Sequence, residues 1–124
     1  HDAIALERLL FDAITGEPDA VTPRFAVVTD ARRREFAYSV HVGLDDDGLP
    51  VRVAGPALAP RDEVDARIAD LGAIRHDAAG VSGSMLALAA ARAIAAGRDI
   101  GPHDPLYLRA PDVTPPAARK RVGA

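Results

Sequence analysis

The first fifteen residues of the chain repeat apolar side chains with the spacing of an amphipathic helix. The apolar positions are Ile4, Leu6, Leu9, Leu10, Ala13 and Ile14. Charged residues take other positions, and Gly16 followed by Pro18 ends the pattern. Because apolar side chains at three- and four-residue intervals share one helix face, this segment predicts a helix that packs on one side.

Three segments of strand-like composition follow, and the middle one has the clearest pattern. Residues 25–29 are dense in β-branched side chains, residues 35–42 alternate, and residues 49–53 follow a turn sequence at residues 45–48. In the middle strand one face would carry Phe36, Tyr38, Val40 and Val42, and the other Ala37, Ser39 and His41. Successive strands with short connections usually pair, so we expect a three-stranded antiparallel meander with His41 on its polar face.

The next part of the chain contains a helix signal and a segment with an ambiguous pattern. Pro60 and Asp62 predict the start of a helix that Gly72 ends. The apolar stripe of this helix is Val64, Ile68 and Leu71. Residues 73–81 stay unassigned, because their first three residues could form a short strand but His76-Asp77 then interrupts the pattern.

A last helix is predicted from its cap and its composition. Ser82 or Ser84 can cap an Ala-rich helix that runs to about Ala96, where Gly97 is the expected stop. The bulk of this helix would come from Met85, Leu86, Leu88 and Ile94. Beyond it, five prolines predict an extended tail that docks on the rest of the chain.

The order of these elements predicts the fold class. A helix, a meander, a helix, an unassigned link and a helix are typical of an α/β fold with α+β character. Residues 1–104 would form one lobe with about three helices packed on the meander, and residues 105–124 a Pro-rich basic tail.

Size and composition limit the classes of function. A chain of 124 residues fits one domain, and its net charge of −3 provides no overall basic field, so any RNA contact would be local. The absence of Cys removes disulfides, thiol nucleophiles and thiolate metal sites, and a cytoplasmic location is expected. No apolar run reaches the roughly 18 residues of a membrane span. Because the chain opens at His1 without Met, we interpret it as a piece of a longer polypeptide.

Three consecutive arginines, Arg32, Arg33 and Arg34, stand between the first two predicted strands. One interpretation is a solvated hairpin turn whose charges keep a sheet corner in water. The other is an arginine fork that binds phosphate or the carboxylate of a partner. The sequence leaves both interpretations open.

Signals for catalysis are weak. Residues 80–84 open a helix but fit neither a nucleophile elbow nor a P-loop, so Ser82 is expected to act as an N-cap. A Ser-His-Asp set can still be assembled from Ser82, His76 and Asp77, which makes a small serine hydrolase or peptidase the enzymatic alternative. The histidines lack metal-binding spacing and the aspartates at residues 45–47 lack that of a calcium loop, so no metal or cofactor is predicted.

The tail is a second candidate contact region. Its aromatic and basic residues are Tyr107, Arg109, Arg119, Lys120 and Arg121. One interpretation is a strap, with Leu106 and Leu108 packed on the lobe and the basic side chains in water. The other is a short electrostatic contact with tRNA or a partner, which would make the chain an RNA-binding module.

Several segments resemble the bacterial TsaB family, also called YeaZ. Residues 30–36, Asp-Ala-Arg-Arg-Arg-Glu-Phe, resemble its strand-turn-strand signature, and residues 105–109, Pro-Leu-Tyr-Leu-Arg, resemble its C-terminal Pro-x-Tyr-Leu-Arg. Residues 2–5 resemble the start of the family's second lobe, and residues 118–121 are similar to the end of actinobacterial members. The chain departs from the family at residues 72–82, which lack its Gly-rich strand, and it lacks the whole first lobe.

The resemblance implies a role in making threonylcarbamoyladenosine at adenosine 37 of tRNA. Family members are non-catalytic relatives of the glycoprotease-like subunit TsaD, have a two-lobed actin-like ATPase architecture, and work with TsaD and the ATPase TsaE. This chain would then be half of that architecture, a scaffold lobe without catalytic, cofactor or metal residues. A missing first lobe would leave apolar surface uncovered along the opening helix or on the sheet face of Phe36 and Tyr38, so self-association is expected.

Overall fold

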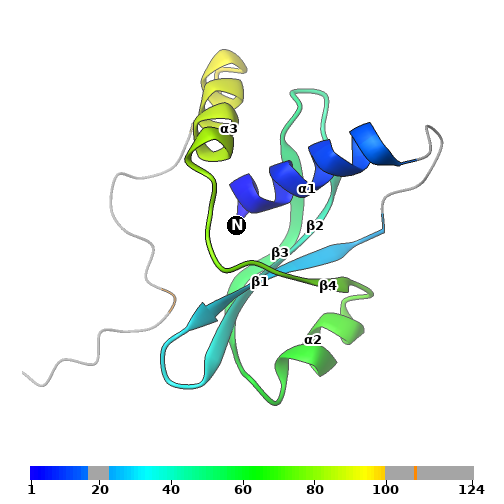
Figure 1. The fold of residues 1–124 in the computed structure, drawn as a ribbon, viewed down its shortest axis with the longest axis vertical. Helices are drawn as coiled ribbons and strands as arrows, with labels where there is room; N and C mark the ends of the chain where they lie inside the picture. The colour runs from blue at the N-terminus through cyan, green and yellow to red at the C-terminus, as the bar shows by residue number, and fades with distance from the viewer. Residues whose placement is uncertain (17–22, 100–107, 109–124) are drawn as a thin grey trace, which may run out of the picture.

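The computed structural model describes residues 1–16, 23–99 and 108, which form three helices and one four-stranded sheet, with the first two helices on the sheet and the third helix beside the first (Figure 1). The elements are α1 (Asp2–Thr15), β1 (Phe25–Ala31), β2 (Glu35–Leu44), β3 (Pro50–Pro60), α2 (Val64–Asp70), β4 (Ile74–Asp77) and α3 (Gly83–Ala95). The predicted α/β class, with an antiparallel meander and helices packed on it, is confirmed. The proposed boundary between a lobe at residues 1–104 and a tail at residues 105–124 lies outside the described residues.

The sheet has the order β3-β2-β1-β4, and its fourth strand differs from expectation. Strands β1, β2 and β3 pair antiparallel as predicted, whereas β4 pairs parallel to β1, with Phe25 opposite Ile74 and Val28 opposite Asp77. The sequence interpretation that His76-Asp77 interrupts a strand was therefore wrong. This segment forms a strand because it pairs with the buried strand β1, and backbone hydrogen bonds to a neighbouring strand outweigh a weak local propensity.

The third strand and the second helix also have different bounds from those predicted. Strand β3 starts in the predicted segment of residues 49–53 but continues to Pro60, and α2 begins at Val64 instead of near Pro60. Glu35 at the start of β2 pairs with Pro60, so the long partner strand extends β3. Prolines are tolerated there because β3 is an edge strand of the described sheet, where an N–H is dispensable on the outer side.

The hydrophobic core has two layers, one on each face of the sheet. Helix α1 covers one face, where the cluster contains Ile4, Ala5, Leu9, Phe25 and Val27. Helix α2 covers the other face, where the cluster contains Ala26, Val28, Tyr38, Val40, Ala59, Val64 and Ile68. Tyr38 is only 8% exposed and Phe36 packs against the same cluster, so the expectation of an uncovered face at these two residues was wrong.

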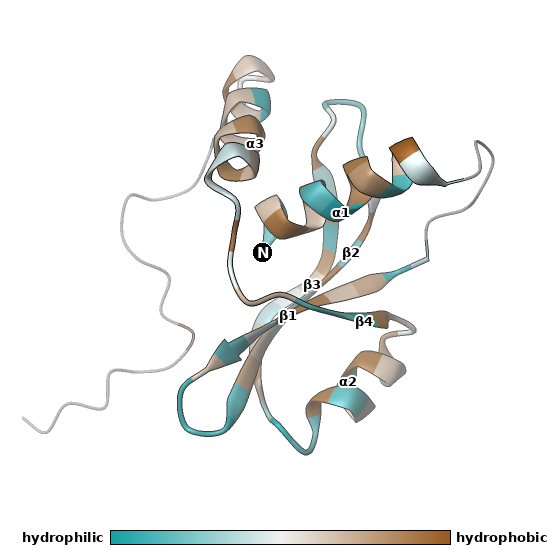
Figure 2. Cartoon of the chain, viewed as in Figure 1, coloured by the Kyte–Doolittle hydropathy of each residue, from teal (hydrophilic) through white to brown (hydrophobic). Residues whose placement is uncertain are grey.

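Apolar side chains remain exposed on the two helices that lie beside each other. In α1, Phe11 is 64% exposed and Ile14 is 83% exposed, although the predicted apolar face includes Ile14. Helix α3 contacts α1 but contains no buried residue, and its Leu86 and Ile94 face solvent. Figure 2 shows apolar residues at the end of α1 and along α3. The described surface therefore includes exposed apolar side chains at the C-terminal end of α1 and, apart from them, along α3.

Candidate functional site

A crevice of about 760 Å³ lies where the first turn of α1, strands β1 and β3, and helix α3 approach one another. Its polar lining residues are His1, Asp2, Thr29 and Arg52. Its apolar lining residues include Val81, Leu86, Ala89, Ala90 and Leu108. This division into a polar and an apolar wall makes the crevice a candidate site.

His1 connects the start of α1 to two strands. Its Nδ1 lies 2.7 Å from Ser39 Oγ in β2, and its Nε2 lies 2.8 Å from Thr29 Oγ1 in β1. Both ring nitrogens are thus hydrogen-bonded to hydroxyl groups, which can donate or accept. The side chain of Ser39 is fully buried, so no substrate in the crevice reaches it, and this arrangement serves to fasten the helix to the sheet.

Asp2 forms a second connection from the same turn of α1. Its Oδ1 accepts a hydrogen bond from His41 Nε2 at 2.9 Å, and Arg52 Nη1 lies 4.0 Å from the same oxygen. The hydrogen bond from His41, and to a smaller extent the charge of Arg52, lower the pKa of Asp2, although partial burial opposes the shift. Asp2 is therefore a carboxylate at neutral pH that bridges a buried imidazole and a surface guanidinium.

The burial of His41 corrects a sequence interpretation. The sequence predicts a polar strand face for His41 and Ser39, but both are fully buried, and the His41 ring stacks on Phe25 with centroids 5.8 Å apart. The apolar face of α1 requires a sheet face to pack on, and the polar strand residues find partners in the first helix turn. The signal was present in the sequence as the polar pair His1-Asp2 ahead of an apolar helix face.

One atom in this cluster has no hydrogen-bond partner among the residues that the structure describes. His41 Nδ1 is buried and makes no hydrogen bond in the structure, while Nε2 of the same ring donates to Asp2. An unpaired buried polar atom is costly, so His41 is held in place by its bond to Asp2 and by packing. Because neither ring nitrogen is free at the crevice surface, this histidine orders the fold and does not face a ligand.

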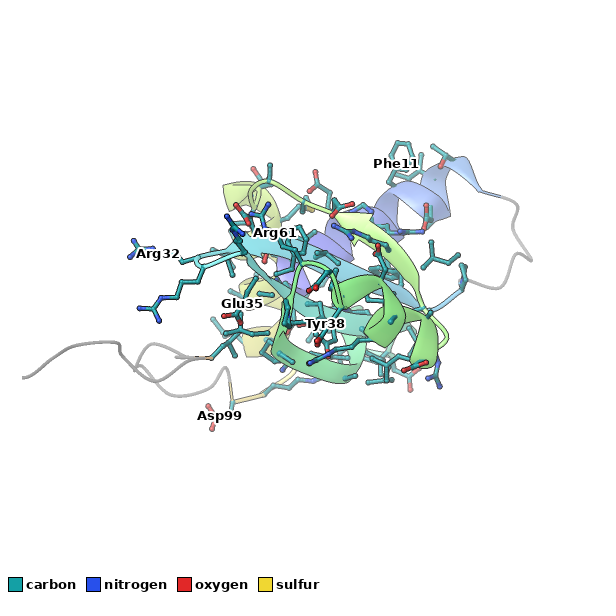
Figure 3. The ribbon with its side chains drawn as sticks, turned by 90° about the horizontal axis from the view of Figure 1, so that it is seen from below. Phe11, Arg32, Glu35, Tyr38, Arg61 and Asp99 are labelled. Carbon is teal, nitrogen blue, oxygen red and sulfur yellow. The ribbon has the colours of Figure 1, made fainter. Side chains whose placement is uncertain are left out.

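The three arginines between the first strands form the hairpin tip that joins β1 and β2. Arg33 has φ = 63° and Arg34 has φ = 58°, the left-handed region that favours Gly or Asn. The side chains of Arg32, Arg33 and Arg34 are exposed, and Figure 3 shows Arg32 extending away from the sheet. At the base of the tip, Arg61 forms an ion pair with Asp30 and lies over the Phe36 ring. The hairpin therefore presents guanidinium groups above a base that is held by strand pairing and by the ion pair between Arg61 and Asp30.

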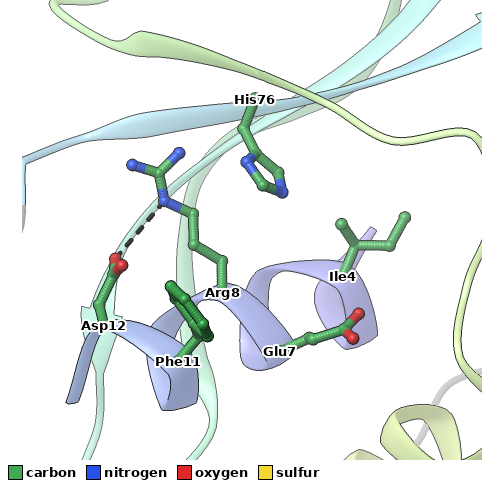
Figure 4. Close-up of a pocket in the computed structure, with 6 residues that line it drawn as sticks. All are labelled: Ile4, Glu7, Arg8, Phe11, Asp12 and His76. Atoms are coloured by element: carbon green, nitrogen blue, oxygen red, sulfur yellow. Dashed lines mark ion pairs between the residues drawn. The ribbon is translucent and has the colours of Figure 1, made fainter. Parts of the chain in front are cut away.

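The two residues of the hydrolase alternative have separate structural roles. Ser82 is the N-cap of α3, where its Oγ accepts a hydrogen bond from Met85 N at 3.4 Å, as the sequence predicts. His76 lies across a cleft of about 450 Å³ from Arg8 and Phe11 of α1 (Figure 4). Burial lowers the pKa of His76 and the charge of Arg8 lowers it further, while Asp12 opposes the shift.

The remaining candidates fall partly outside the described residues. Tyr107, Arg109, Arg119, Lys120 and Arg121 all lie there. Leu108, the one described residue of this segment, lines the crevice. Within the described part of the chain, His, Asp and Glu side chains form no group of three that could hold a metal ion. In the same residues no helix combines the length and the apolar character needed to cross a membrane.

Comparison with known proteins adds no match to the short motifs described from the sequence. No protein-family model matches this chain, and no curated protein matches it either. The similarity to the TsaB family therefore remains that of residues 2–5, 30–36, 105–109 and 118–121.

Proposed function

We propose that this chain is the C-terminal lobe of a TsaB-like protein, a cytoplasmic non-catalytic scaffold that supports TsaD- and TsaE-dependent threonylcarbamoylation of tRNA. The segments at residues 30–36 and 105–109 support the family assignment. An α/β body with helices on both faces of one sheet is consistent with half of an actin-like fold. The observation that carries the scaffold role is the exposure of large apolar side chains at the end of α1 and along α3.

The exposed side chains on α1 are large enough for a packing partner to gain stability by covering them. Phe11 and Ile14 are large apolar residues near the end of α1, and full burial of one such side chain contributes about 1.5–3 kcal/mol. Exposed apolar patches are typical of interaction sites. A first lobe of the family that packed on α1 would gain this stabilisation, and the scaffold would in return hold that lobe in place.

The polar cluster supports a structural role as well. His1 is bonded to Ser39 and Thr29, and Asp2 is bonded to His41, so these groups stabilise the fold. A catalytic site would instead aim an activated nucleophile and a base at a space where substrate fits. His1 and Asp2, which line the crevice, instead form hydrogen bonds with other side chains of the protein.

The proposal is tested by binding to the first lobe of a TsaB-type protein expressed as a separate chain. Titration calorimetry should give a complex with the 124-residue chain. A double variant, Phe11→Asp with Ile14→Asp, should weaken it at least about tenfold, because the lost apolar burial corresponds to more than 1.4 kcal/mol. Val53→Asp is the matched control, since Val53 is an apolar residue that is 45% exposed on strand β3 and belongs to neither helix.

The cellular readout is threonylcarbamoyladenosine in tRNA, measured by mass spectrometry of nucleosides from bacteria that lack their own TsaB. Co-expression of the chain with the first lobe should restore the modification, and the Phe11→Asp, Ile14→Asp variant should not. No complex with the first lobe, or unchanged tRNA, would overturn the proposal. Labelling of Ser82 by a serine-reactive probe, read as an added mass, would favour the hydrolase alternative.

A contact with tRNA at the hairpin tip is the second candidate, favoured by the exposed arginines. Arg32, Arg33 and Arg34 offer adjacent guanidinium groups of the kind that bind phosphate. Fluorescence anisotropy with tRNA should then show binding that weakens with salt and falls when all three become Gln. Equal affinity in wild type and triple variant would exclude the contact.

A further inference from the structure

Strand β4 leaves one side of the described sheet open. Ile74 N donates to Arg24 O at 2.9 Å and Ala78 N donates to Val28 O at 2.9 Å, so these residues direct their backbone groups toward β1. Backbone groups alternate in direction along a strand. Arg75 and Asp77 therefore direct their N–H and C=O groups outward, at an edge where the described residues provide no further strand.

We propose that two copies of this chain associate through β4, pairing antiparallel across a two-fold axis so that Arg75 of each copy lies opposite Asp77 of the other. The sheets of both copies would then form one continuous sheet. This inference rests on strand β4 and the side chains beside it, and it does not depend on the proposed function.

The charges of the strand select this register. Pairing of Arg75 with Asp77 of the second copy exchanges both backbone hydrogen bonds of each residue, and the symmetry repeats them on the other side of the axis. A register shift of two residues, the smallest that keeps the outward-facing residues hydrogen-bonded, would place Arg75 opposite Arg75 in one direction, or Asp77 opposite Asp77 in the other. Opposite charges in directly facing pairs stabilise a sheet, whereas like charges destabilise it.

The side chains on both faces of the strand are compatible with this pairing. On the α2 face, Arg75 already contacts Asp77 at 2.9 Å and Asp65 at 2.8 Å, and the facing Asp77 would join the same guanidinium, which has five N–H donors. On the α1 face, Ile74 would lie opposite Ala78, and the exposed fraction of Ile74, now 54%, would fall. His76 would face its own copy at the axis.

Exposed apolar surface next to the seam would add to the contact. The cleft beside β4 is lined by His76 and by Phe11, whose ring is exposed on α1 (Figure 4). A second copy brought to the β4 edge would approach this ring and reduce its contact with water. Association through this short strand therefore does not depend on backbone hydrogen bonds alone.

The opposite edge of the sheet is protected against the same association. Strand β3 contains Pro50, Pro56 and Pro60, each of which lacks an N–H. Prolines on an edge strand are a common means of preventing edge-to-edge pairing. Strand β4 has no proline and carries one charge of each sign, a pattern that permits pairing with itself.

Two charge variants of the full chain test the register by sedimentation equilibrium. Arg75→Asp places Asp at both positions, and Asp77→Arg places Arg at both. In a homodimer of either variant, residues of like charge would lie opposite each other, so the dissociation constant of the dimer should rise at least about tenfold above that of the wild type. A mixture of the two should form a heterodimer, because each Asp then faces an Arg.

Arg61→Asp is the matched control, since Arg61 also forms an ion pair and lies 4.9 Å from the Phe36 ring centroid, compared with 4.8 Å for Arg75. It should dimerise like the wild type, and circular dichroism should show all variants folded. Hydrogen exchange should show the amide protons of Arg75 and Asp77 protected only in the dimer. A wild type that stays at 13.0 kDa at all concentrations, or a dimer insensitive to both charge changes, would overturn the proposal.

Discussion

Asp2 and His41 join the first turn of α1 to the centre of the sheet, through a hydrogen bond of 2.9 Å between Asp2 Oδ1 and His41 Nε2. The imidazole is completely buried and the carboxylate is half exposed, so the bond runs from the interior to the surface. Because the other ring nitrogen of His41 has no partner, this bond is the one that satisfies the buried ring.

Removal of the carboxylate should therefore destabilise the fold. Asp2→Ala leaves the buried N–H of His41 unpaired, and we expect a loss of about 1–2 kcal/mol in the free energy of unfolding, measured in urea. Asp12→Ala is the control, because the Asp12 carboxylate of the same helix lies 3.5 Å from Arg8 near the surface and should change the value by less than about 0.5 kcal/mol. Equal effects of both substitutions would contradict the anchoring role.

The same bond gives an acid dependence with a defined sign. The pKa of Asp2 is lowered in the folded state below its ordinary value of 3.8, chiefly by the hydrogen bond from His41. Its contribution to stability is therefore complete above pH 3.8 and is lost as the pH falls through the folded-state pKa. Asp2→Asn should flatten the loss of stability in this range, measured by urea unfolding at several pH values below 5.

The elements with strong local signals were predictable from sequence. Helix α1 begins and ends where its apolar period and Gly16 indicate, and α3 begins after Ser82 as its cap predicts. These signals lie within a few residues of the element they define. Strand β4 carries no such signal, because its pairing partner β1 lies about fifty positions earlier in the sequence, and pairing over that distance is set by the tertiary fold.

The candidate site was the least predictable part for a related reason. Ser39 and His41 alternate with apolar residues, which is the pattern of a strand with one solvated face. Only the position of α1 shows that this face is covered and that His1 supplies the partner of Ser39. Polar residues at alternate strand positions thus identify a face, and the packing of a distant helix decides whether that face is buried.

His76 gives a second pH dependence, at higher pH. Burial and the charge of Arg8 lower its pKa in the folded state below the ordinary value of 6.5. The folded protein therefore favours the neutral imidazole, so this stabilisation is complete above pH 6.5 and is lost as the pH falls through the folded-state pKa. Urea unfolding between pH 7.5 and 5 should show a smaller decrease in His76→Gln than in the wild type.

The electrostatic part of that prediction has its own measurement. Arg8→Gln removes the positive charge, so an NMR titration of the His76 ring should give a higher pKa in this variant than in the wild type. Arg52→Gln removes a charge near Asp2 and should leave the His76 titration unchanged. A shift of equal size in both variants would show that general charge, and not proximity, sets the pKa.

The protein should become more stable when a residue with positive φ at the hairpin tip is replaced by Gly. Arg33 and Arg34 have positive φ, which costs a residue with a side chain roughly 1–2 kcal/mol relative to Gly. Since Gly also loses more entropy on folding, we expect Arg33→Gly or Arg34→Gly to raise the free energy of unfolding by about 0.5 kcal/mol. Arg32→Gly is the matched control from the same turn, and it should lower the value or leave it unchanged.

Two isoleucines in different helices should respond differently to the same substitution. Ile68 of α2 is 3% exposed within the core cluster, whereas Ile94 of α3 is 65% exposed. Ile68→Ala should lower the free energy of unfolding by about 2–4 kcal/mol because it opens a cavity, and Ile94→Ala should change it by less than about 0.5 kcal/mol. Thermal and urea unfolding of both variants provide the measurement. A large loss for Ile94→Ala would mean that α3 is covered in the protein in solution, which would locate the contact made by its exposed face.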